Sequence, residues 1–98
     1  MKIRLSNNSI RIRLSQSDLD SIKNGISLSI QLPIGTQDLV FTLKFGETIE
    51  CNANEISIAL PQTTLLPWIA SRETSLSTNI TYPNNRTLRL IVEKDFLG

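Results

Sequence analysis

Residues 3–22, I-R-L-S-N-N-S-I-R-I-R-L-S-Q-S-D-L-D-S-I, have a close counterpart in residues 49–68, I-E-C-N-A-N-E-I-S-I-A-L-P-Q-T-T-L-L-P-W. The two stretches lie 46 positions apart and share seven identical residues. These pairs are Ile3/Ile49, Asn8/Asn54, Ile10/Ile56, Ile12/Ile58, Leu14/Leu60, Gln16/Gln62 and Leu19/Leu65. Because the identities run through a turn, a strand and a helix face in the same order, they predict a fold built from one unit used twice.

Alternating apolar and polar residues predict that each copy begins with two antiparallel strands. In the first copy Asn7-Asn8 separates the alternating segments, and asparagine suits a two-residue turn because it tolerates positive φ. A turn at this point sets Leu5 opposite Ile10 and Ile3 opposite Ile12. All four apolar side chains then share one face of the hairpin.

The rest of each copy reads as a short helix followed by two further strands. Ser15, with Asp18 three residues later, resembles an N-terminal capping box. We expect helices at about 16–23 and 63–71. The order strand–strand–helix–strand–strand thus occurs over residues 1–46 and again over 47–92, with a charged tail at 93–98, in a single domain spanning 1–98. Phe96 and Leu97 in the tail are expected to dock on the body or to meet a partner chain.

The predicted fold class is mainly β (α+β), with eight short antiparallel strands, two short helices and pseudo-two-fold symmetry. Helices of about 12 Å cannot cover a flat sheet of about 35–40 Å. The sheet must therefore curl, split into two packed sheets or dimerise. We expect a small barrel or curled sheet; a two-layer structure covered by a partner is the alternative. The helices are expected to plug the two ends, and Cys51 is expected in the core because it aligns with Leu5. The expected plugs are Leu19, Ile22, Leu65 and Trp68.

Composition excludes several classes of function. Charged residues make up 19% of the chain and the net charge is +1, so we expect no nucleic-acid and no membrane partner. The chain has no histidine and one cysteine, which excludes a Ser-His arrangement and an ordinary zinc site. We therefore predict no catalytic residues, no metal and no cofactor. No apolar run approaches the roughly 20 residues of a spanning helix and no secretory signal is recognised, so a cytoplasmic location is expected.

One cluster of charges is unusual. The hairpin register places Arg4 opposite Arg11 and Lys2 opposite Arg13, and like charges directly opposite one another are destabilising. The four residues, the cationic face, are candidate anion-binding residues: Lys2, Arg4, Arg11 and Arg13. Alternatively they pair with nearby carboxylates, or remain solvated and protect a sheet edge. The carboxylates within reach are Glu50, Glu55, Glu93 and Asp95. The second copy has Glu50, Ser57 and Ala59 at equivalent positions and lacks this face.

Three segments resemble a family of small bacterial proteins of unknown function: Met1-Lys2-Ile3-Arg4, the stretch S-I-R-I-R-L-S at residues 9–15, and V-E-K-D-F at residues 92–96. The resemblance covers nearly the whole chain. It implies a bacterial, cytoplasmic protein and supplies no activity.

Two hypotheses of function follow from the sequence. The first is a non-enzymatic binding or protein-interaction module, with a homo-oligomer or another protein as partner. The second is an anion- or phosphate-binding barrel, including an enzyme acting on a phosphorylated small molecule. In that barrel a reversed curl would turn the cationic face inward, together with Lys44 and Arg89.

Overall fold

The structure is a computed structural model and describes residues 1–95. It contains eight strands and two α-helices, in the expected order. The expected docking of Phe96 and Leu97 concerns residues outside this part of the chain. The elements are β1 (Lys2–Ser6), β2 (Ser9–Leu14), α1 (Gln16–Lys23), β3 (Leu28–Ile34), β4 (Gln37–Phe45), β5 (Ile49–Asn52), β6 (Glu55–Leu60), α2 (Gln62–Ala70), β7 (Ser75–Tyr82) and β8 (Arg86–Lys94), with a 3₁₀ turn at Pro83–Asn85 between the last two.

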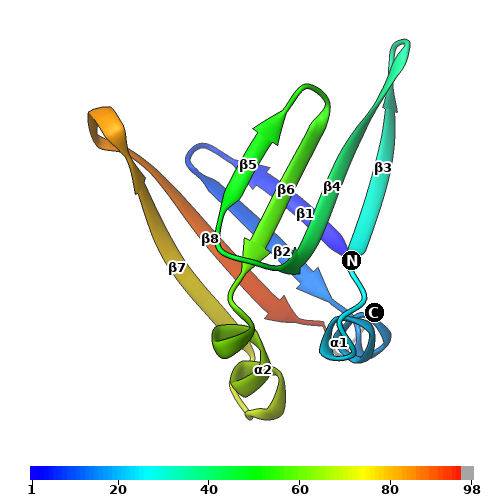
Figure 1. Cartoon of the computed structure of the whole chain (residues 1–98), viewed down its shortest axis with the longest axis vertical. Helices are drawn as coiled ribbons and strands as arrows, with labels where there is room; N and C mark the ends of the chain where they lie inside the picture. The colour runs from blue at the N-terminus through cyan, green and yellow to red at the C-terminus, as the bar shows by residue number, and fades with distance from the viewer. Residues whose placement is uncertain (96–98) are drawn as a thin grey trace.

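The strands form two four-stranded sheets that lie face to face (Figure 1). Sheet A has the order β1-β2-β8-β7 and sheet B the order β3-β4-β6-β5. Each sheet therefore takes one hairpin from each half of the chain. The mainly β class with eight strands and two helices is confirmed.

The sheets are mixed, whereas the sequence suggested antiparallel pairing throughout. Four strand pairs are hairpin partners and antiparallel, but the central pairs β2–β8 and β4–β6 are parallel. These parallel pairs join the two halves, which alternation within a strand cannot reveal. The pseudo-two-fold symmetry relates the two parallel strand pairs. Next to β2–β8, Arg89 N–H donates to Asn8 O, and next to β4–β6, Val40 N–H donates to the equivalent Asn54 O, both at 2.8 Å.

The first hairpin has the expected register. Leu5 lies opposite Ile10 and Ile3 opposite Ile12, while Arg4 faces Arg11 and Lys2 faces Arg13. Asn8 supplies the positive φ of the turn, at +63°. In the second copy the positive φ belongs to Ala53, at +51°, so the two turns are closed differently although both have two residues.

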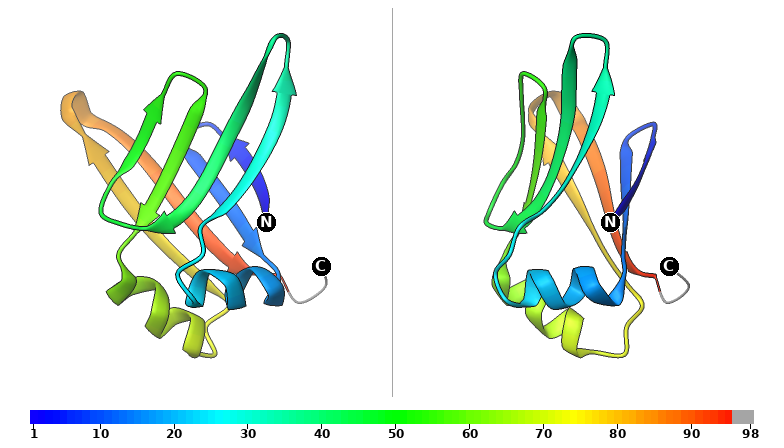
Figure 2. Two further views of the ribbon diagram at one scale, coloured as in Figure 1. Left: turned by 45° about the vertical axis from the view of Figure 1, so that its right-hand side comes forward. Right: turned by 90° about the vertical axis from the view of Figure 1, so that its right-hand side faces the viewer.

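Both helices lie at the same end of the molecule (Figure 2), where each carries the chain from one sheet to the other. The expectation that they plug opposite ends is wrong for this reason. Ser15 and Asp18 form a complete capping box: Asp18 N–H donates to Ser15 Oγ (3.1 Å) and Ser15 N–H donates to Asp18 Oδ2 (3.0 Å). The four expected plug residues are all buried, with Leu65 completely so.

The core lies between the sheets and is closed by the helices. The inward positions of β2 and β8 are fully buried at Ile12, Leu14, Leu90 and Val92, each with 0% exposure. Cys51, in contrast, is exposed, and its expected burial is wrong. Its alignment with Leu5 is nevertheless informative, because Leu5 is also 57% exposed. Both residues lie on edge strands towards the hairpin turns, away from the helices that close the core.

Within residues 1–95 no strand pair joins one sheet to the other, and a groove opens between hairpin ends of both sheets, at the end away from the helices. The result is two packed sheets rather than a closed barrel, one of the three arrangements that the short helices allowed. Apolar side chains remain uncovered near the open end, among them Leu32 (51% exposed) and Ile34 (55%). Within residues 1–95 four edge strands result: β1, β7, β3 and β5.

Candidate anion-binding site

The four cations expected to lie together do so, on the outer surface of sheet A. Apolar residues of β2 point into the core, so the alternate residues Arg11 and Arg13 point outward, and all four members of the cationic face are exposed. Together with Ile3 they line a shallow depression of about 260 Å³. The hairpin register therefore builds a compact square of cations on a regular scaffold rather than on a loop.

Two of these cations are paired with carboxylates from the C-terminal segment. Arg11 Nε lies 3.1 Å from Glu93 Oε1, and Lys2 Nζ donates to Asp95 Oδ2 at 3.4 Å. The sequence named both carboxylates as candidate partners; the two others that it named, Glu50 and Glu55, belong to sheet B.

Arg4 and Arg13 form no ion pair within the part of the chain that the structure describes. Four positive and two negative charges leave this surface with a local charge of +2. Two guanidinium groups are thus available to an external anion. The arrangement could also protect the β1 edge from pairing with another chain, since charged side chains on an edge strand oppose such pairing.

The start of β1 is held by a further ion pair. The Met1 ammonium lies 2.7 Å from Asp18 Oδ2, which joins the end of β1 to the first turn of α1. Burial raises the pKa of Asp18, but hydrogen bonds from the Met1 ammonium and from Ser15 outweigh it, and the net pKa lies below its usual value. This contact restrains the strand that carries Lys2 and Arg4.

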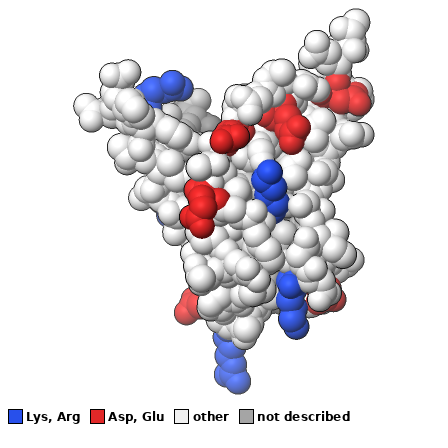
Figure 3. All heavy atoms as spheres, viewed as in Figure 1, with Lys and Arg blue, Asp and Glu red and all other residues white. Residues whose placement is uncertain are grey.

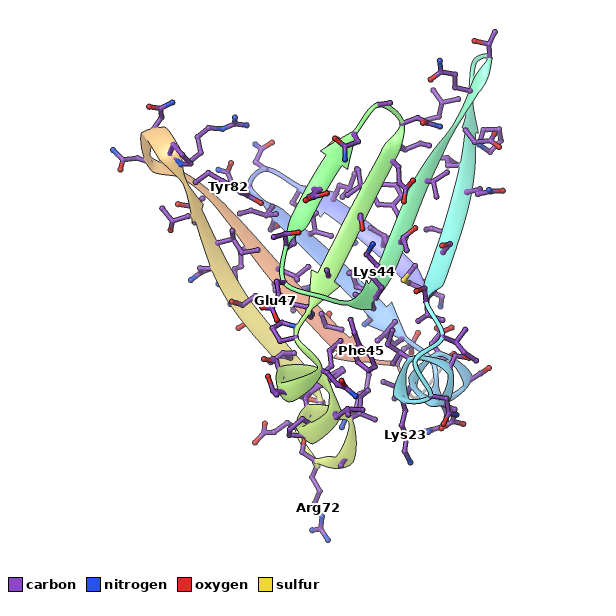
Figure 4. The ribbon with its side chains drawn as sticks, viewed as in Figure 1. Lys23, Lys44, Phe45, Glu47, Arg72 and Tyr82 are labelled. Carbon is purple, nitrogen blue, oxygen red and sulfur yellow. The ribbon has the colours of Figure 1, made fainter. Side chains whose placement is uncertain are left out.

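The opposite side of the molecule is acidic. Figure 3 shows acidic side chains on the side of sheet B, and the exposed residues concerned are Asp38, Glu47, Glu50 and Glu55. Lys44 projects from β4 on this side (Figure 4). The reversed curl, in which Lys44 and Arg89 would join the cationic face inside a barrel, is therefore wrong: the apolar face points inward. The anion hypothesis is reduced to the outer surface of the first hairpin.

A larger groove lies at the open end between the sheets, with a volume of about 1050 Å³. Tyr82, labelled in Figure 4, lines it together with Arg86, Glu50 and Cys51. The sequence did not predict this groove, because its walls come from hairpin ends of both sheets. One signal was available in the sequence: the aromatic Tyr82 and the cationic Arg86 flank the Pro83-Asn84-Asn85 segment. Among the described residues no group of three or more His, Cys, Asp or Glu side chains could hold a metal ion.

These features define a small, mainly β protein of two mixed sheets with a cationic outer surface at one sheet edge. Within residues 1–95 no helix has the length and apolar character needed to cross a membrane. The chain belongs to the family of unknown function DUF7009, whose family model matches residues 1–97. The resemblance to a family of unknown function is thereby confirmed. Comparison with curated proteins and with solved structures gives no match.

Proposed function

We propose that the protein is a non-enzymatic binding module that holds an anionic group, of the phosphate monoester class, on its cationic face. The observation that carries the proposal is the pair of exposed guanidinium groups, Arg4 and Arg13, which have no carboxylate partner among the described residues. Guanidinium groups match the oxygens of phosphate bidentately and stay charged at any physiological pH. The one potential nucleophile among the four residues of the face, the amine of Lys2, is ion-paired with Asp95, and the chain has no histidine to act as a base, which favours binding over catalysis.

At the other two cations, carboxylates of the protein itself compete with an external anion. Glu93 and Asp95 occupy Arg11 and Lys2 in the free protein, so a ligand binds first to Arg4 and Arg13. Removing the carboxylate of Glu93 would release Arg11 to the ligand. The phosphate affinity of such a site should therefore fall when a cation is removed and rise when a neighbouring carboxylate is removed.

The test is titration with inorganic phosphate and pyrophosphate at constant ionic strength, with chloride as the control anion, because exposed charges are screened by salt. We expect Arg4→Gln/Arg13→Gln to weaken phosphate binding by about tenfold or more, which is about 1.4 kcal/mol. Glu93→Gln should strengthen it. Arg72→Gln is the control for loss of an exposed guanidinium group elsewhere on the surface, since Arg72 lies beyond the far end of α2 (Figure 4).

The proposal fails if phosphate and chloride bind alike, or if Arg4→Gln/Arg13→Gln binds phosphate as well as Arg72→Gln does. In that case edge protection is the better explanation. The double variant would then self-associate without any change in anion affinity.

We also infer that the two halves arose from one duplicated unit and that the protein is bacterial and cytoplasmic. Five of the seven identical pairs fall in the same burial class, for example Leu19 at 3% and Leu65 at 0% exposure, which supports duplication. The free, exposed thiol of Cys51 suits a reducing compartment. Cell fractionation tests the location, and recovery outside the cytoplasm would overturn it.

A further inference from the structure

The four edge strands of the described chain differ in how they are protected from pairing with another strand. Natural proteins protect edges with charged side chains, proline, bulges or short strands. The edge strand β1 carries Lys2 and Arg4, β3 contains Pro33, and β5 has four residues and carries Glu50. Three of the four edges thus have a recognisable protective feature.

The fourth edge strand, β7, has none of these features. Its sequence is SLSTNITY, eight residues without charge or proline and without a positive φ. Most of its side chains are exposed, and only Leu76 and Ile80 are half-buried. In Figures 1 and 2 it forms the outer margin of sheet A, so one row of its backbone N–H and C=O groups faces outward.

The side of the molecule next to β7 is also incomplete. A hollow of about 310 Å³ lies between β7 and β5, and Ile49, Leu60 and Ile80 contribute to its lining. The hollow exists because β7 and β5 are edges of different sheets, and no strand of the described chain joins them. A strand added to β7 would extend sheet A beyond this opening and would cover it with its own inward side chains.

We propose that β7 is a dimerisation strand, which pairs antiparallel with β7 of a second copy of this chain. In a symmetric antiparallel pair the two-fold axis is perpendicular to the sheet, so opposite residues share a face. An axis at Asn79 sets Thr78 opposite the partner's Ile80 and Leu76 opposite the partner's Tyr82. These are apolar and β-branched pairs of the kind that stabilise sheets, and no charge meets its like.

A second copy fits this edge because the strand is self-complementary. Pairing of β1 with itself would instead bring cations towards cations. The dimer would contain one continuous sheet of eight strands, with β1 at both outer edges. The cationic faces therefore remain free, and this inference does not depend on the proposed anion binding.

The experiment measures oligomeric state by sedimentation velocity over a wide range of protein concentration. The wild-type chain is expected to form a concentration-dependent dimer. Asn79→Lys places two like charges next to the two-fold axis and should weaken the dimer by about fivefold. Gln31→Lys, the same change of charge at an exposed position of the edge strand β3, is the control for net charge and should leave the dimer intact.

A mixture of the Asn79→Lys and Asn79→Asp variants separates a broken interface from a broken fold. Opposite charges at the axis should restore a heterodimer, which a misfolded variant could not form. Asn79→Lys should also retain phosphate affinity if the cationic face binds phosphate. A wild-type chain that stays monomeric, or a dimer that survives Asn79→Lys unweakened, would overturn the proposal.

Discussion

The connection between the two halves crosses β6 so closely that a side chain at Gly46 would clash with it. A Cβ added there would lie 2.8 Å from the Cβ of Ala59, which is 5% exposed. Two hydrogen bonds hold the crossing: Gly46 N–H donates to Leu60 O at 3.0 Å, and Ala59 N–H donates to Thr48 O at 3.2 Å. Because both Cβ atoms are fixed to hydrogen-bonded backbone, Gly46→Ala cannot be relieved by a rotamer change.

Overpacking of this kind costs about 1–3 kcal/mol. Part of it, about 0.5–1 kcal/mol, is offset because alanine restricts the unfolded chain more than glycine does. We therefore expect Gly46→Ala to lower the free energy of unfolding by about 1–2 kcal/mol, measured by urea denaturation. For a domain of this size, that corresponds to a fall in Tm of about 4–16 °C.

A double-mutant cycle tests the cause. Ala59→Gly alone should destabilise the strand by about 1 kcal/mol, yet in the Gly46→Ala background it removes the clash. The double variant should then be no less stable than Ala59→Gly, with a coupling energy of about 1 kcal/mol or more. The reasoning would be refuted by a Gly46→Ala variant as stable as the wild type, or by two effects that simply add.

The ion pair at Asp18 leads to one further prediction, and the sharing of each sheet between the two halves of the chain leads to another. Because the folded-state pKa of Asp18 is lowered, its contribution to stability is present above the unfolded pKa of about 3.9 and is lost as the pH falls through the folded value. Asp18→Asn should lower the free energy of unfolding at pH 7, measured by urea denaturation, by about 1 kcal/mol or more, and should flatten the decline of that free energy below about pH 4; an unchanged acid profile would contradict this. Chains cut between Gly46 and Glu47 should yield two unfolded fragments, because neither holds a complete sheet. Mixing them should restore the native fluorescence of buried Trp68. A folded 1–46 fragment would be evidence against sheets that each need a hairpin from both halves.

The sequence predicted the parts of the fold that are set by neighbouring residues. Strict alternation around Asn7-Asn8 determined the register of the first hairpin, and with it the grouping of Arg4 with Arg11. The Ser15–Asp18 spacing correctly located the start of α1. In each case a local physical rule connects residues only a few positions apart, so the pattern and the structure agree.

Arrangements between distant segments could not be predicted in the same way. Parallel pairing of β2 with β8 depends on which hairpin packs beside which, and the apolar pattern is identical for either choice. Alternation places Cys51 on the inward face correctly but does not show how far the opposite sheet extends. The expected burial of Cys51 is wrong, and of the expected small barrel or curled sheet the closed barrel does not form, for the same reason: a groove separates the sheets at the end where their hairpins turn.

Each sheet combines one hairpin from each half of the chain, and this arrangement makes the two sheets form at different stages of folding, although pseudo-symmetry relates them. Sheet B is built from a continuous segment, residues 28–60, and its parallel pair brings Leu43 beside Ile58. Sheet A joins the two ends of the described chain, for example Ile10 with Leu90. Contacts between distant residues form slowly because a long loop must first close. A chain emerging from the ribosome can thus complete sheet B early, while β1 and β2 wait for β8 to be synthesised.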